Sequence, residues 1–162
     1  MLNLDDSYKK LLGSKELKDF KSKNKSAFLY ACFFVSEGNW QFDFYNPKDE
    51  MITTLEVSDK GIKVMPVDKA FKDDRTKISE LHVDKVKMGF DEAVKLVNDF
   101  VSKQYPGDKF FTKTIAILQN LDNKVTWNIT LLTSTLKLLN VKLDASSGKV
   151  VSHCIESFLT MK

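Results

Sequence analysis

The spacing of apolar residues changes from helical to alternating in the last third of the chain. Between Phe90 and Val101 apolar residues recur every three or four positions, which places them on one helix face. Asp91 and Glu92 stand in the first turn, where the helix dipole favours acidic side chains, and Tyr105-Pro106-Gly107 ends the helix. The pattern then predicts four strands, over about residues 111–121, 125–132, 138–143 and 149–158.

The first half shows the same order of elements. Leu4, Tyr8 and Leu11 share a helix face before Gly13 interrupts the pattern, with Asp5, Asp6 and Ser7 as possible caps. Ser14 can cap a second short helix, so we predict a helix pair or a kinked helix over about residues 5–22. Four strands are predicted to follow, over residues 27–35, 40–44, 51–57 and 62–67.

One spacing is common to the two halves. Trp40 stands as far before Gly61 as Trp127 stands before Gly148, which indicates one supersecondary unit used twice. We therefore expect an α+β fold, a tandem repeat of a helix followed by a four-stranded antiparallel sheet with a cystatin-like layout. The predicted boundaries are a first unit over residues 1–68, a linker with a possible extra strand over 69–88, and a second unit over 89–162.

The predicted strand over residues 27–35 is apolar on both sides. Regular alternation would place Phe28, Tyr30, Cys32 and Phe34 on one side, and Leu29, Ala31, Phe33 and Val35 on the other. A helix can cover only one of these faces. The second must meet the other repeat, a second chain or a ligand, because an open patch of this size favours aggregation. The candidate partner-binding residues are Phe28, Tyr30, Phe34 and Tyr45.

The composition is that of a globular chain with a mixed charged surface. Charged residues make up 29% of the 162 residues, and the formal net charge is +3. Arg75 is the only arginine, although arginine is preferred for bidentate contacts with phosphates and bases. We therefore expect no nucleic-acid partner.

The chain contains no apolar segment of the roughly 20 residues that a membrane-spanning helix needs, so we predict no membrane span. Its first residues are acidic and lack the basic and apolar regions of a secretory signal. These features predict a cytoplasmic location. An extracytoplasmic location remains open for a chain whose native start lies before Met1.

Few residues are arranged for chemistry. His82 and Asp84 would share one side of a strand, but two ligands do not complete a metal site, and the chain has no CxxC or HExxH motif. His153 and Cys154 would point to opposite faces of their strand. Cys32 and Cys154 are predicted to be buried free thiols, with a disulfide between them left open. GxSxG and phosphate-binding glycine motifs are also missing. We predict no catalytic residue, no metal, no cofactor and no enzymatic activity.

The second unit resembles a PepSY domain. The matching residues are 90–96 at the helix start, Tyr105-Pro106-Gly107, Trp127, and 141–150 at the last turn. The first unit matches only through Trp40 and residues 57–61. The tandem layout is also similar to that of the β-lactamase inhibitory proteins. This resemblance implies no catalysis, and it implies binding or inhibition of a partner protein or a chaperone-like role, usually outside the cytoplasm.

Together these observations predict a non-enzymatic protein-binding or inhibitor-like module whose partner is not identified. One alternative is a small-molecule binder or enzyme with a pocket between helix and curved sheet, lined by groups such as Tyr30, Asp43, Tyr45 or His82. Another is a homodimer formed through the strand over residues 27–35.

Overall fold

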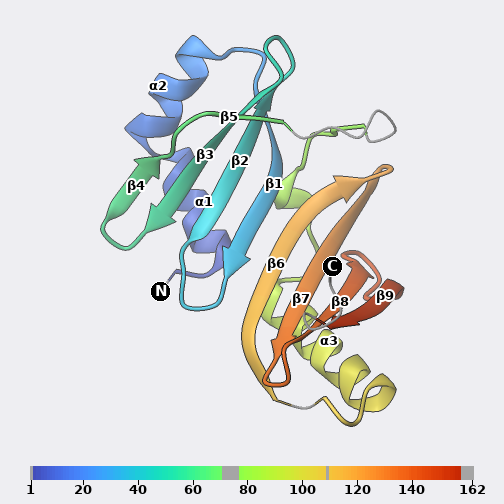
Figure 1. Cartoon of the computed structure of the whole chain (residues 1–162). Coiled ribbons are helices and arrows are strands. Elements are labelled where there is room, and N and C mark those ends of the chain that lie inside the picture. The colour runs from blue at the N-terminus through green and yellow to red at the C-terminus, as the bar shows by residue number, and fades with distance from the viewer. Residues whose placement is uncertain (1, 71–76, 109, 158–162) are drawn as a thin grey trace.

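The computed structural model describes residues 2–70, 77–108 and 110–157. Within these residues it is an α+β structure with three α-helices and one nine-stranded antiparallel sheet (Figure 1). The helices are α1 (Leu4–Leu12), α2 (Lys15–Lys23) and α3 (Phe90–Gln104), with a short 3-10 helix η1 (Val83–Lys85). The strands are β1 (Phe28–Val35), β2 (Trp40–Asn46), β3 (Met51–Ser58), β4 (Gly61–Val64), β5 (Asp68–Lys69), β6 (Phe111–Leu121), β7 (Lys124–Thr133), β8 (Lys137–Asp144) and β9 (Val150–Ser157).

The sheet has the strand order β4-β3-β2-β1-β6-β7-β8-β9, and β5 pairs with β3. Strands β1–β4 and β6–β9 are each a meander of neighbouring antiparallel strands. The two meanders join where Phe33 of β1 pairs with Ile117 of β6. In Figure 1, α1 and α2 lie beside the first meander and α3 lies beside the second.

Local sequence determines the start of both N-terminal helices. The Asn3 side chain accepts a hydrogen bond from the Asp6 amide at 2.8 Å, so Asn3 caps α1 in place of the residues predicted. The Ser14 hydroxyl oxygen accepts from the Leu17 amide at 3.1 Å and caps α2. The predicted helix pair is therefore confirmed.

All three helices cover the same face of the sheet. A row of paired residues crosses six strands on this face, and every member is fully buried. The row is Leu55, Phe42, Cys32, Leu118, Trp127 and Leu143. Tyr8 of α1 stacks on Phe42 with ring centroids 5.8 Å apart. Residues of α3 pack on the same side in the second half.

The regular alternation predicted for β1 is wrong at Tyr30. Leu29 pairs with Phe44, but Ala31 pairs with Asp43, so Tyr30 is an extra residue in a β-bulge. Leu29, Cys32 and Phe34 therefore face the helices. Because the bulge reverses the alternation, Phe33 and Val35 face the opposite side together with Phe28.

The strand predicted within residues 80–88 is also not formed. The Leu81 amide donates a hydrogen bond to the Leu29 carbonyl at 2.8 Å, and the chain then turns into η1. Leu81, Val83 and Met88 are buried in the helix-side core. Residues 71–76 of the predicted linker, and Phe158 of the predicted last strand, lie outside the described residues.

An aromatic cluster joins the two halves into one core. Trp40 packs against both Phe34 and Phe90, with ring centroids 4.9 and 5.3 Å away, and these two phenylalanines also contact each other. Trp127 contacts both Trp40 and Phe90. The indole Nε1 of Trp127 donates a hydrogen bond to the Met88 carbonyl at 3.0 Å. This cluster supports the start of α3 from both halves.

We predict that Trp127→Phe lowers the free energy of unfolding by about 2–4 kcal/mol, because it leaves a cavity and an unpaired buried carbonyl. Urea denaturation followed by circular dichroism measures this change. Val151→Ala is the control, since Val151 is 63% exposed, and it should change the value by less than about 0.5 kcal/mol. Equal effects of the two substitutions would contradict the proposed importance of the cluster.

A second prediction concerns the turn before β9. Gly148 has φ 73°, and a Cβ there would lie 2.9 Å from Met88 Cε and 3.0 Å from Leu96 Cδ1. Gly148→Ala should therefore destabilise the protein by about 1–2 kcal/mol in a thermal or urea unfolding experiment. Gly107→Ala is the matched control, because no atom lies within 4 Å of its Cβ position. The Gly107→Ala substitution should leave the free energy of unfolding almost unchanged.

Candidate functional site

The face of the sheet opposite the helices has an apolar centre. Phe33 pairs with Ile117 and Val35 pairs with Ile115, so these four residues form a block across the β1–β6 junction. All four are half-buried. We call them the central apolar patch and call this side of the sheet the helix-free face. An apolar block on an uncovered sheet face is typical of a binding surface.

Polar side chains flank the patch on both sides. On the β2–β3 side, the Gln41 amide nitrogen lies 3.3 Å from a carboxylate oxygen of Glu56. On the other side, the Asn140 amide nitrogen donates to the Asn128 side-chain oxygen at 2.6 Å and to the Thr130 hydroxyl at 2.8 Å. The patch therefore has a satisfied polar rim, the arrangement found in protein interfaces.

Asp43 is a half-buried carboxylate on this face. The Thr54 hydroxyl donates a hydrogen bond to Asp43 Oδ1 at 2.5 Å. Burial raises the pKa of Asp43, and the Thr54 hydrogen bond opposes this shift. Burial, aided by the charge of Asp43, raises the pKa of Tyr30 to about 12. Tyr30 is therefore a neutral hydrogen-bonding group at physiological pH.

The predicted partner-binding residues are divided between the two faces. Phe28 and Tyr45 are paired on the helix-free side, with ring centroids 5.7 Å apart, but Tyr45 is itself only 4% exposed, so its predicted role at a binding surface is not supported. Tyr30 occupies the bulge. Phe34 is only 4% exposed and packs against Trp40 and Phe90. Phe34 is thus part of the core, and the bulge is the physical reason.

The groups suggested for a pocket between helix and sheet do not gather there. Tyr30 and Asp43 lie on the helix-free side. Tyr30 lines a hollow of about 260 Å³ with Ile52 and Gln119. His82 is exposed, with its Nε2 3.9 Å from a Glu80 carboxylate oxygen. A pocket between helix and sheet does exist, but other residues line it.

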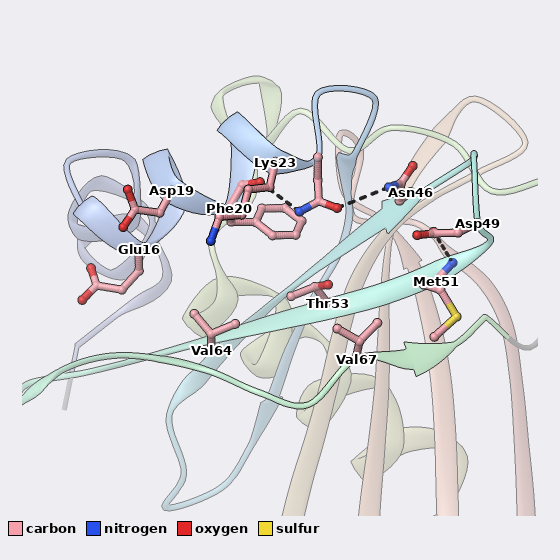
Figure 2. A pocket seen from close by; sticks show the side chains of 11 residues that line it. Glu16, Asp19, Phe20, Lys23, Asn46, Asp49, Met51, Thr53, Val64 and Val67 are labelled. Atoms are coloured by element: carbon pink, nitrogen blue, oxygen red, sulfur yellow. Dashed lines mark hydrogen bonds between the residues drawn. The ribbon is translucent and has the colours of Figure 1, made fainter.

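That pocket, the α2 pocket, has a volume of about 380 Å³ and lies between α2 and the β3–β4 edge of the sheet (Figure 2). Phe20 forms one wall, and Thr53, Val64 and Val67 lie opposite it. The remaining lining residues are Glu16, Asp19, Lys23, Asn24, Asn46, Asp49 and Met51. None of these residues was singled out from the sequence as a site residue. The alternation of apolar and polar residues predicts only a strand over residues 62–67, and it does not indicate a pocket.

The two cysteines differ in environment. Both are free, Cys32 is buried as predicted, and Cys154 is exposed, so its predicted burial is wrong. His153 and Cys154 do face opposite sides of β9. The His153 ring packs against Phe100, with centroids 4.9 Å apart, and its Nδ1 lies 2.8 Å from the Tyr105 hydroxyl.

Across residues 2–70, 77–108 and 110–157, no helix is both long and apolar enough to cross a membrane. In the same part of the chain, no three His, Cys, Asp or Glu residues are grouped so that they could hold a metal ion.

The fold is similar to that of one protein of known structure. A crystal structure from Clostridium difficile 630, described as a "putative lipoprotein", matches with a TM-score of 0.54 and 13% sequence identity. The match covers 87% of this chain and 90% of that chain. At this identity the likeness shows the fold alone. No protein-family model matches the chain, and no curated protein matches it.

Asp43 generates a prediction about pH and stability. Its pKa is raised in the folded protein, so ionisation opposes folding at pH 7, and this cost disappears below the ordinary value of 3.8. Asp43→Asn keeps an acceptor for Thr54 and removes the charge. We expect a higher free energy of unfolding than wild type at pH 7, and a smaller difference as the pH falls towards 3.8.

Urea denaturation at several pH values measures both effects. Thr54→Val provides the converse test, because it removes the hydroxyl that stabilises the ionised form. It should destabilise the protein more at pH 7 than in acid. An Asp43→Asn variant that loses the same stability at every pH would show that burial of the charge is not the controlling factor.

Proposed function

We propose that this protein is a non-enzymatic protein-binding module that binds its partner through the helix-free face. The observation that carries the proposal is the central apolar patch. It lies across the middle of a continuous sheet, on the side that faces away from α1, α2 and α3. Its four residues come from strands of both halves, so the surface requires both meanders to be joined.

The dimensions of the sheet fit such a role. Eight strands in the main order, spaced by about 4.8 Å, give a face roughly 34 Å wide. A standard protein interface buries about 800 Å² on each partner. An apolar centre with a rim of amides, hydroxyls and carboxylates is also the usual division of polarity in an interface.

We also infer that the two halves are copies of one unit. A two-fold rotation about the Phe33–Ile117 pair exchanges β1 with β6 and β2 with β7. Trp40 and Trp127 lie in the cross-strand rows next to this pair, one row on each side. The rotation therefore exchanges the two tryptophans. Gly61 and Gly148, with φ 146° and 73°, both lie at the turn into the last strand of their meander.

The inferred duplication agrees with the PepSY resemblance of the second unit, which remains a prediction. A resemblance to that family, and to the similarly arranged β-lactamase inhibitory proteins, implies that the chain recognises a partner protein. It is the reason for preferring a protein partner over a small ligand at the helix-free face.

Site-specific photocrosslinking in cells tests the proposal. A photoreactive residue at position 117 should crosslink to one protein, while the same residue at Lys95, on the exposed side of α3, should not. The compartment of the crosslinked protein also tests the predicted cytoplasmic location. Crosslinks only to a second copy of the chain would favour the homodimer and overturn the proposal.

The partner, once purified, allows a quantitative test. Ile117→Lys places a charge in the central apolar patch, while the lysine stem can still cover neighbouring carbons. We expect this substitution to weaken binding, which raises the dissociation constant by about tenfold or more. Leu12→Lys adds the same charge to α1, where Leu12 is 52% exposed, and should change the constant by less than about twofold. Equal weakening by both variants would contradict binding at the patch.

A further inference from the structure

The α2 pocket is a second surface and lies on the helix side of the sheet. It exists because two short strands share the outer edge of β3. Val64 ends β4, the Met65 amide donates to the Thr54 carbonyl at 2.9 Å, and β5 then pairs with Met51 and Ile52. The chain between β4 and β5 leaves a hollow opposite α2 (Figure 2).

The walls of this pocket are apolar and open to solvent. Val64 is 48% exposed and Val67 is 56% exposed, and both line the hollow opposite Phe20. Phe20 is held in position from behind by Phe44, with ring centroids 5.4 Å apart. Exposed apolar side chains grouped around a pocket of about 380 Å³ match the size and polarity of small-ligand sites.

The polar groups of the pocket are of two kinds. The two amides hold the structure together: Asn46 Nδ2 lies 3.4 Å from Asn24 Oδ1, and Asn24 donates to the Phe20 carbonyl at 3.0 Å. The Thr53 hydroxyl, by contrast, makes no hydrogen bond to any described residue, and Thr53 is almost fully buried. It is therefore available to a bound molecule.

The charges around the pocket are unequal. Glu16, Asp19 and Asp49 contribute three carboxylates, and Lys23 contributes one ammonium. The Asp49 carboxylate already accepts a hydrogen bond from the Met51 amide at 3.1 Å. Glu16 and Asp19 are exposed on α2 at one side of the hollow (Figure 2). The residues that line the pocket therefore carry a net negative charge and would attract a cation, although Lys15, Lys18 and Lys21 also stand on α2 outside the lining.

We propose that the α2 pocket binds a small amphipathic cation, a molecule with one aromatic or branched apolar group and one ammonium. The apolar group packs between Phe20 and the two valines, and the ammonium lies at the Glu16–Asp19 side. This site is on the opposite side of the sheet from the central apolar patch. It is independent of the proposed protein binding, and either can fail without the other.

Three probes of similar size separate charge from shape. They are 2-phenylethylammonium, 2-phenylethanol and 3-phenylpropanoate, which share a phenyl ring and differ in charge. Titration of an isotope-labelled sample, followed by amide shifts in NMR spectra, gives both affinity and location. We expect saturable shifts at Phe20, Thr53 and Val64. The ammonium should bind about fivefold more tightly than the alcohol at low salt, and the carboxylate most weakly.

Two variants test the assignment of residues. Glu16→Gln combined with Asp19→Asn should reduce the ammonium affinity to about that of the alcohol. Val67→Lys places a cation in the pocket and should lower ammonium affinity by at least about tenfold. Asp91→Asn combined with Glu92→Gln makes the same change of charge on α3, and it should leave binding within about twofold.

Clear outcomes would overturn the proposal. They are an absence of saturable binding by the ammonium, equal affinity for all three probes, or shifts confined to the helix-free face. If the doubly substituted α2 variant does not fold, Val67→Lys still decides the result, because Val67 is exposed outside the helix. Crosslinking at position 117 is unaffected by any of these outcomes.

Discussion

The pairing of β1 with β6 is the contact on which the rest of the molecule depends. It joins residues Ala31–Val35 to Ile115–Gln119 and turns two separate meanders into one sheet. Without it, Trp40 and Trp127 would not share a core, and the start of α3 would lose the first-half side of its aromatic packing. The central apolar patch would also be split into two pairs of residues. One short stretch of backbone hydrogen bonds thus determines both the interior and the proposed binding surface.

Alternation of side chains gives the two faces of this sheet different chemistry. The row that contains Phe42 and Trp127 is fully buried under the helices, whereas the next row, with Phe33 and Ile117, is half-buried. Polar neighbours such as Gln41 and Asn128 occur only on the second row. Because the helices cover one face, the proposed recognition of a large partner is assigned to the other face. The α2 pocket is an exception on the helix side, where α2 is short and leaves part of the sheet edge open.

Much of the fold could be predicted from the order of apolar residues. The stripe beginning at Phe90 and the strands around Trp127 follow their periods closely, and Ser14 marks the second helix as expected. The bulge at Tyr30 could not be predicted, since no glycine marks it and only pairing with β2 reveals it. Because Tyr30 is an extra residue in β1, Phe34 lies in the core and Phe33 lies on the helix-free face. The α2 pocket was missed for a similar reason, because it depends on where β4 leaves the edge of β3.

The β1–β6 junction also has a consequence for the order of folding. Each meander consists of hairpins between neighbouring strands, but the junction joins residues far apart in the chain, and the bond between Ser36 and Thr114 beside it spans 78 positions. Contacts that close such long loops form late. Until they form, β1 and β6 are open edges with apolar side chains, and each can pair with the matching strand of another molecule. At high concentration during refolding, we expect exchange of whole meanders between chains to compete with correct closure.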